Sequence, residues 1–369
     1  MEFTVKQPAL LKELEILQGV VERKNTVPIL ANVLISATAE GLELMGTDLQ
    51  VSVRSRSQVS VKAHGAVCVS AKKLFEIVRL LPDKDIVLRT DAENWLSVVC
   101  ERSRFRVMGL AREDFPTLPS PEKSTRVKIP GPIFRKLVER VLFAVTSDDA
   151  RFALNGALLI LKDKSIALVA SDGHRLAHVT DALDARGPSE EERVLIPRKA
   201  LSEIARIAGD LKEDVFYCRK ENHLFFEIGS CLLTSRVLEG TFPNFEKVIP
   251  VGNDKIVEFE RQELMTALTR VSVLANERSR AIRFAVKDGT AEISSKNPEM
   301  GDASEVIPID YREAEIEIGF NAKYLLDFLA VTGTARVKIE LKDDATQGVL
   351  RPAGEESGSY TYVVMPMRL

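Results

Sequence analysis

The run at residues 171–176, which reads S-D-G-H-R-L, gathers the residue types of a hydrolytic site in one place. Hydrolysis by a nucleophilic side chain needs a nucleophile and a base in mutual hydrogen-bond reach, and a third group that orients the base. Asp172 and His174 could meet locally beside Ser171, but the similar segments elsewhere in the chain carry no histidine. A turn in which Gly173 takes an unusual backbone angle explains the same residues. The pattern therefore favours protein binding over a plain turn, and a turn over catalysis.

Metal and cofactor chemistry have little support. His174 and His178 stand four residues apart, a spacing that suits two metal ligands, but no carboxylate or cysteine completes the set. The chain contains no GxxxxGK[ST] phosphate loop and no GxGxxG, HExxH or GxSxG motif. Four cysteines form no CxxC pair and are predicted to be buried free thiols: Cys68, Cys100, Cys218 and Cys231. We expect no metal, no cofactor and no enzymatic activity.

A lysine recurs near the predicted first turn of three similar segments. These are residues 69–82 with Lys72, residues 196–209 with Lys199, and residues 320–333 with Lys323. The interval between them is the size of a domain, whereas solenoid repeats run to roughly 50 residues at most. One such lysine is most simply a solvated charge, but three in register would make a periodic positive surface once the repeats are assembled.

Each lysine must be positioned by a helix, because apolar residues recur at i, i+3, i+4 and i+7 in all three segments. In the last segment these are Leu325, Phe328, Leu329 and Thr332. Further helices are predicted at residues 8–20, 134–145 and 264–274, and strict alternation at residues 51–62 predicts one strand.

Helices and strands alternate in the same order three times, with turn-rich linkers at residues 116–125 and 250–254. The predicted fold is α+β, with mostly antiparallel sheet. It has three repeated domains, each of two helix-plus-sheet halves, at residues 1–126, 127–252 and 253–369.

The composition, 45% hydrophobic and 28% charged residues among 369, is that of a soluble, core-forming chain. No apolar run approaches the roughly 18 to 20 residues that span a bilayer, and the N-terminus has no secretory pattern, so we expect a cytoplasmic protein. A net charge of −3 argues against nucleic-acid binding over the whole surface. It leaves room for a positive charge confined to one face.

Several motifs are specific enough to carry a resemblance. They are P-I-L-A-N at residues 28–32, S-D-G-H-R-L at 171–176, I-P-R-K at 196–199, F-P-N-F at 242–245, N-P-E at 297–299 and V-V-M-P-M-R-L at 363–369. In order and spacing the chain resembles the β subunit of bacterial replicative DNA polymerase, the sliding clamp family, from end to end. The resemblance implies a head-to-tail homodimeric ring, with helices around double-stranded DNA and sheets outside. Such a ring is held on DNA by topology and confers processivity on the polymerase.

The resemblance implies DNA-facing cations that neutralise phosphates without reading bases. The candidates are Lys24, Lys72, Lys73, Arg135, Arg140, Arg198, Lys199, Arg206 and Lys323. Asp148 and Ala153 depart from relatives that carry a neutral polar side chain and an aromatic there, which puts DNA contacts from residues 146–153 in doubt.

The resemblance also implies a groove for a short linear motif shared by the replicative polymerase catalytic subunit, the clamp loader, other polymerases and repair proteins. The matching residues are Leu154, Ser171, Gly173, His174, Arg175, Leu176, Pro243, Lys247, Val248, Val363, Val364, Met365, Pro366, Met367, Arg368 and Leu369. Methionines and branched aliphatics form adaptable apolar pockets, and Arg175 with Arg368 could bind an acidic group of the partner.

A third implied surface joins the first domain of one subunit to the last domain of the other. Its residues are Arg102, Arg104 and Phe105 on one side, and Val273, Leu274, Glu299, Asp302 and Glu305 on the other. Pairing of sheet edges there would remove exposed strand edges.

Two alternatives remain. A hydrolase using Ser171, Asp172 and His174 would lose turnover when His174 is replaced, whereas a clamp would lose only partner binding. A monomeric peptide-binding module would elute near the mass of one chain, whereas a ring would elute near twice that mass.

Overall fold

The computed structural model describes residues 1–369 apart from 22–26, 122–123, 147, 184–189, 210–212, 355–357 and 369. The chain forms two compact units, which are described separately: Met1–Arg135 with Lys199–Val237, and Lys136–Arg198 with Leu238–Leu369. Neighbouring strands are antiparallel in each sheet, so the α+β prediction is confirmed. The domain boundaries at residues 126 and 252 stay a prediction.

The first unit is built on a thirteen-stranded sheet in the order β10-β15-β16-β17-β4-β3-β2-β6-β9-β8-β7-β1-β5. Its strands are β1 (Glu2–Lys6), β2 (Asn32–Thr38), β3 (Gly41–Thr47), β4 (Val51–Ser57), β5 (Ser60–Ala63), β6 (Gly65–Ser70), β7 (Asp85–Thr90), β8 (Trp95–Cys100), β9 (Ser103–Leu110), β10 (Val127–Ile129), β15 (Val215–Lys220), β16 (His223–Ile228) and β17 (Cys231–Arg236). Short 3-10 turns are η1 (Pro28–Ala31) and η2 (Arg112–Asp114).

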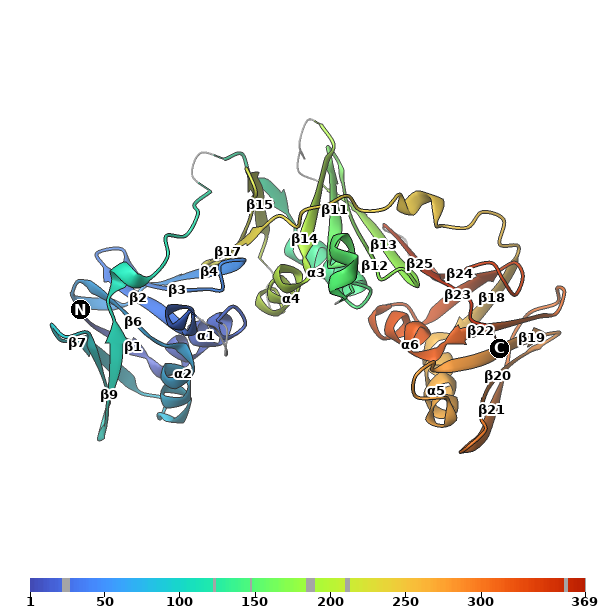
Figure 1. The fold of residues 1–369 in the computed structure, drawn as a ribbon, viewed down its shortest axis with the longest axis horizontal. Coiled ribbons are helices and arrows are strands. Elements are labelled where there is room, and N and C mark those ends of the chain that lie inside the picture. The colour runs from blue at the N-terminus through green and yellow to red at the C-terminus, as the bar shows by residue number, and fades with distance from the viewer. Residues whose placement is uncertain are drawn as a thin grey trace. The chain divides into compact units, whose positions relative to one another are not determined.

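Helix α1 (Gln7–Gln18) packs against α2 (Ala71–Leu80) in this unit (Figure 1). The buried face of α2 consists of Ala71, Leu74 and Val78, and the hydroxyl of Ser70 caps its first turn by accepting from the backbone N–H of Lys73. The prediction of a single strand at residues 51–62 is wrong. Strand β4 ends at Ser57, and a separate strand, β5, begins at Ser60 and pairs with β1.

The sheet of the first unit is continuous because β17 pairs with β4, two strands that lie far apart in the sequence. Leu232 lies opposite Arg54 and Leu233 opposite Val53 in this register. Helices α3 (Gly131–Leu142) and α4 (Arg198–Ile207) each contain a point where the chain passes from one unit to the other.

The second unit holds an eight-stranded sheet, β14-β11-β12-β13-β25-β24-β23-β18, and a four-stranded sheet, β21-β20-β19-β22. The strands are β11 (Gly156–Lys162), β12 (Ser165–Ser171), β13 (Arg175–Ala182), β14 (Glu192–Pro197), β18 (Lys255–Glu260), β19 (Ala281–Lys287), β20 (Thr290–Asn297), β21 (Gly301–Pro308), β22 (Ile316–Asn321), β23 (Arg336–Leu341), β24 (Gly348–Pro352) and β25 (Ser359–Val364). The 3-10 turns are η3 (Asp149–Leu154), η4 (Phe245–Lys247) and η5 (Ser272–Leu274).

Helix α5 (Arg261–Val271) packs against α6 (Ala322–Val331) (Figure 1). The predicted apolar face of α6 is confirmed, since Leu325, Phe328, Leu329 and Thr332 are all buried. The side chain of Asn321 caps the helix by accepting from the backbone N–H of Lys323 at 2.9 Å.

The four cysteines are free and buried, as predicted. Burial, with the nearby Asp114 and Glu113 carboxylates, raises the pKa of the Cys68 thiol to about 12. In the described part of the chain no group of three potential metal-binding side chains occurs, and no helix is long and apolar enough to cross a membrane.

Candidate partner-binding and DNA-facing sites

The turn between β12 and β13 holds the residues considered for hydrolysis. The carboxylate of Asp172 accepts from the backbone N–H of His174 at 2.9 Å and of Arg175 at 3.1 Å. The hydroxyl of Ser171 donates to the carbonyl of Arg175 at 2.8 Å and accepts from the N–H of Gly173 at 3.1 Å. Gly173 has a φ of +88°, a conformation that favours glycine. Ser171 and Asp172 therefore shape the turn. Oδ1 of Asp172 accepts from the backbone N–H of His174.

Arg175 ties this turn to a distant helix. Its Nε donates to Asp172 at 2.9 Å, its Nη1 to Asp327 of α6 at 2.7 Å, and its Nη2 to the carbonyl of Phe143 at 2.6 Å. The guanidinium also lies over the rings of Phe143 and Tyr324, 5.2 and 4.4 Å from their centroids. With only 8% of the side chain exposed, this arginine is held on every side.

The charged form of Arg175 is stabilised despite its burial. Burial acts to lower the pKa of Arg175, but Tyr362, Asp327 and Asp172 together raise it above the ordinary value. Burial raises the pKa of Tyr362, whose hydroxyl lies 3.5 Å from Nη1 of Arg175, so this phenol stays neutral. Because these nitrogens already bind groups of the chain, the geometry supports a positioning role for Arg175 rather than the predicted contact with an acidic group of a partner.

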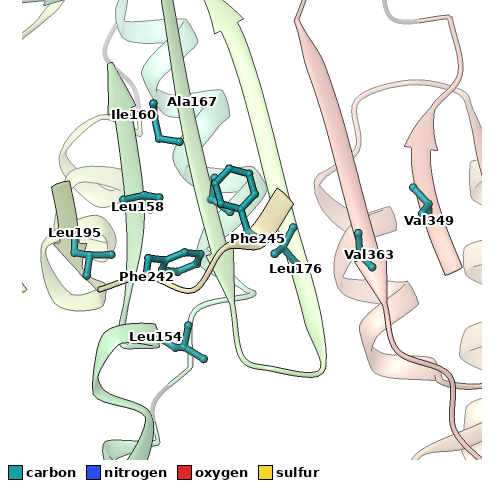
Figure 2. Packing of buried hydrophobic residues seen from close by; sticks show 11 residues of the cluster. Leu154, Leu158, Ile160, Ala167, Leu176, Leu195, Phe242, Phe245, Val349 and Val363 are labelled. Carbon is teal, nitrogen blue, oxygen red and sulfur yellow. The ribbon is translucent and has the colours of Figure 1, made fainter. Parts of the chain in front are cut away.

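An apolar cluster lies beside the turn, and Figure 2 shows it in close view. Its buried members are Leu154, Leu158, Ile160, Ala167, Val169, Leu176, Leu195, Phe242, Phe245, Val349 and Val363, with Leu238, Val248 and Ile249 packed against them. The F-P-N-F segment brings Phe242 and Phe245 onto the strands, where Phe245 contacts the ring of His178 at 5.1 Å between centroids. Four predicted groove residues thus lie in one cluster: Leu154, Leu176, Val248 and Val363.

The C-terminal segment continues from this cluster toward β22. The backbone N–H of Met365 donates to the carbonyl of His174 at 2.9 Å, and that of Met367 to Gly319 at 2.8 Å. Pro366, Met367 and Arg368 line a pocket of about 720 Å³ together with residues 317–319, 344 and 345. Of the other predicted groove residues, Pro243 and Lys247 are exposed, Val364 is buried, and Leu369 lies outside the described residues.

The three recurring lysines, and Lys73 next to Lys72, are each paired with a carboxylate. Their pairs are Lys72 with Glu76 at 3.9 Å, Lys73 with Glu76 at 3.0 Å, Lys323 with Asp327 at 2.8 Å, and Lys199 with the buried carboxylate of Asp48. The hydrogen bond from Lys73 lowers the pKa of Glu76. The side chains of Lys72 and Lys73 remain accessible, since they are 69% and 65% exposed, whereas that of Lys199 is 34% exposed.

The predicted DNA-facing arginines differ in their surroundings. Arg135, Arg198 and Arg206 are exposed, and Arg206 also pairs with Glu203. Arg140 is 6% exposed and packs over the ring of Tyr360, which leaves little of its side chain accessible to DNA. Lys24 lies outside the described residues.

The residues predicted for the dimer interface lie on or next to strands at sheet edges. Beyond its short pairing with β6 at residues 109–110, β9 pairs only with β8 among the described strands, and β21 is the last strand of its sheet. Arg102, Arg104 and Phe105 are exposed near one edge. On the other, Val273, Glu299 and Asp302 are exposed, Leu274 is half-buried, and Glu305 pairs with Arg270 at 2.9 Å.

Sequence reasoning missed the residues that complete these sites. Asp327 is the main example, although its position four residues after Lys323 is a signal for an ion pair on a helix. The same spacing joins Lys72 to Glu76. No local signal points to Phe143 or Asp48, because their partners are far away in the sequence.

Three family models cover nearly the whole chain. They describe the DNA polymerase III beta subunit: its N-terminal domain at residues 1–119, its central domain at 128–244 and its C-terminal domain at 246–368. The chain belongs to the DNA polymerase III beta subunit family. This family provides a non-catalytic processivity subunit, so the hydrolase alternative is wrong. The hydrogen bonds of Ser171 and Asp172 shape the turn.

Known beta sliding clamps are similar along their full length. Those of Pseudomonas putida and Escherichia coli are 39% and 34% identical, with 100% of both chains covered. The crystal structure of the DNA polymerase III subunit beta of Pseudomonas aeruginosa matches with a TM-score of 0.92 at 38% identity, also over 100% of both chains. The sliding clamp of Bacillus subtilis matches at 0.94 with 27% identity. The resemblance inferred from the motifs is confirmed, and the chain is a DNA polymerase processivity clamp.

Proposed function

We propose that two copies of this chain close head to tail into a ring around duplex DNA and tether the polymerase to its template. The observation that carries this proposal is the succession of three beta-subunit domains along one chain, matched at full length by sliding clamps. A ring holds DNA by topology, so its individual contacts with phosphates can be weak. A net charge of −3 over the chain is compatible with such a grip.

The ring would close through the exposed edges of β9 and β21. Phe105 on β9 and Val273 beside β21 are exposed apolar side chains that an interface would bury. Arg102 and Arg104 would face Glu299 and Asp302, so complementary charges would set the orientation of the two subunits. Each chain would then comprise the three predicted domains, 1–126, 127–252 and 253–369.

Inside the ring, Lys72, Lys73, Lys199 and Lys323 would contact phosphates, together with Arg135, Arg198 and Arg206. Contacts of this kind are independent of sequence and sensitive to salt, which suits a protein that slides. Lys24, which lies outside the described residues, is also proposed to contact phosphates.

The apolar cluster and the C-terminal segment would accept a short linear motif from the polymerase catalytic subunit, the clamp loader and repair proteins. One solved clamp of Pseudomonas aeruginosa, 38% identical, is bound to griselimycin. The exposed Met365 and Arg368 would meet the peptide, while the buried Arg175 would hold the turn in place. The ring would act in the cytoplasm.

Primer extension on a long, singly primed circular template tests the function. With the replicative polymerase, its clamp loader and ATP, we expect the chain to lengthen the products made in a single binding event. Arg104→Glu should weaken the dimer in sedimentation at low micromolar concentration and shorten the products. Short products with the wild-type chain, or an unchanged dimer in the variant, would contradict the proposal.

A further inference from the structure

A pocket of about 300 Å³ lies on the first unit, and none of its lining residues belongs to the proposed groove, dimer edges or DNA-facing cations. It is lined by two arginines of β4, by the turn and strands around β17, and by the segment that precedes β10. The lining residues that matter here are Arg54, Arg56, Arg126, Glu227 and Leu232. Nothing in the clamp function accounts for a pocket with three arginines.

The sheet register explains why these side chains meet. Arg54 lies opposite Leu232 on the neighbouring strand, and Leu232 lies opposite Glu227 on the next. Arg56 follows two residues after Arg54 and therefore points to the same face of the sheet. Ser120, Pro121 and Arg126 complete the lining.

Positively charged side chains outnumber negatively charged ones in the lining, which holds three arginines and one glutamate. Arg54 and Arg56 both approach a single carboxylate oxygen of Glu43, at 3.6 and 2.9 Å. Arg126 pairs with Glu227. Among the described residues, three guanidinium groups thus share two carboxylates.

Arg54 contributes a second, independent observation. Its Nε is buried and lacks a hydrogen-bond partner within the described part of the chain, because 3.6 Å to Glu43 exceeds hydrogen-bond length. A buried donor without a partner costs free energy, and a bound water or ion commonly satisfies it. The charge excess favours an anion over a water at this position.

We propose that this pocket binds a small oxyanion, a phosphate or carboxylate group, through Arg54, Arg56 and Arg126. The planar guanidinium fork matches the oxygens of either group. The volume lies at the low end for small-molecule sites, about 300 Å³, so it fits a ligand of a few heavy atoms beyond the anionic group. The bound anion would also hold the segment containing Arg126 on the sheet where β4 meets β17. This inference is independent of the clamp function.

Isothermal titration of the full-length chain at constant ionic strength tests the proposal, with inorganic pyrophosphate and citrate as probes for the two chemistries. We expect saturable binding of at least one probe, with one site per chain. Arg54→Met keeps the aliphatic stem and should weaken binding at least tenfold. Arg126→Met, at a more exposed position, should do so too, whereas the control Arg312→Met at an 87% exposed arginine should not.

The two probes also identify the ligand class, because stronger pyrophosphate binding assigns a phosphate ligand and stronger citrate binding a carboxylate. If Arg54→Met fails to fold, Arg126→Met decides the question alone. The proposal is overturned if neither probe binds saturably to the wild-type chain, or if the pocket variants bind as the wild type does.

Discussion

Arg175 and Lys72 both pair with carboxylates, but their surroundings differ. Arg175 is 8% exposed and binds Asp172 and Asp327 at once, with aromatic rings over its guanidinium. Lys72 is 69% exposed and shares Glu76 with Lys73. A buried pair is costly to break because an uncompensated charge is left behind, whereas an exposed pair contributes little. The same chemistry thus gives a fixed turn beside the proposed partner groove at one place, and an exposed, adjustable ion pair at a proposed DNA contact at the other.

Asp327 belongs to both regions, since it also accepts from Lys323. Its carboxylate therefore connects the buried arginine to one of the lysines proposed to face DNA. Substitutions at the buried and at the exposed pairs should therefore differ in their effects.

Replacing Arg175 with Leu should cause the largest loss of stability. Breaking a buried pair of this kind costs about 3–5 kcal/mol, because Asp172 and Asp327 would lose their shared partner. Urea unfolding followed by circular dichroism measures the loss. The matched control Arg312→Leu removes an 87% exposed arginine and should leave the midpoint nearly unchanged. Equal midpoints in the two variants would show that burial does not distinguish the sites.

Met365→Ala should weaken binding of a partner peptide without destabilising the fold. Met365 is 39% exposed beside the cluster, so its side chain is available for contact with a ligand. We expect a loss of about tenfold, or about 1.4 kcal/mol. Fluorescence anisotropy with a labelled peptide that carries the linear motif of the polymerase catalytic subunit would measure it, with Val251→Ala as a control at a 91% exposed position. Unchanged affinity would remove Met365 from the groove.

Glu76→Gln should strengthen DNA binding slightly. Loss of this carboxylate releases Lys72 and Lys73 for phosphates, which we expect to raise the affinity for DNA about two- to threefold at low salt. The gain should fade as salt rises, because exposed charges are screened. Filter binding over a salt series measures it, with Glu313→Gln, at an exposed residue on a loop, as the control. A loss of affinity would contradict the pairing as an inhibitory contact.

His178 should give the free energy of unfolding a mild pH dependence. Burial lowers the pKa of His178, so the folded chain keeps this imidazole neutral at a pH where the unfolded chain takes up a proton, near the ordinary histidine pKa of 6.5. Stability should therefore be present above this pH and decline as pH falls below it. Unfolding curves measured between pH 5.5 and 7.5 should show that the free energy of unfolding changes less with pH in His178→Gln than in the wild type. An identical slope in the variant would assign the effect to other groups.

The repeated helices could be predicted because their signal is local. An apolar face written at i, i+3, i+4 and i+7 is enough to place Leu325 and Phe328 in the core. The Arg175 site could not be derived in this way, since Asp327 lies 152 residues from its partner. For Arg140 the local pattern misleads. A charged residue on a helix is predicted to be exposed, but the guanidinium of Arg140 lies over the ring of Tyr360.

The most direct test of the ring is retention on DNA of two topologies. The chain is loaded by a clamp loader with ATP onto a nicked circular plasmid, half of the sample is linearised, and protein that remains bound is measured by gel filtration at moderate salt. The account predicts that the chain stays on the circle and leaves the linear form by running off its ends. Equal release from both forms would contradict it, because binding would then depend on charge alone.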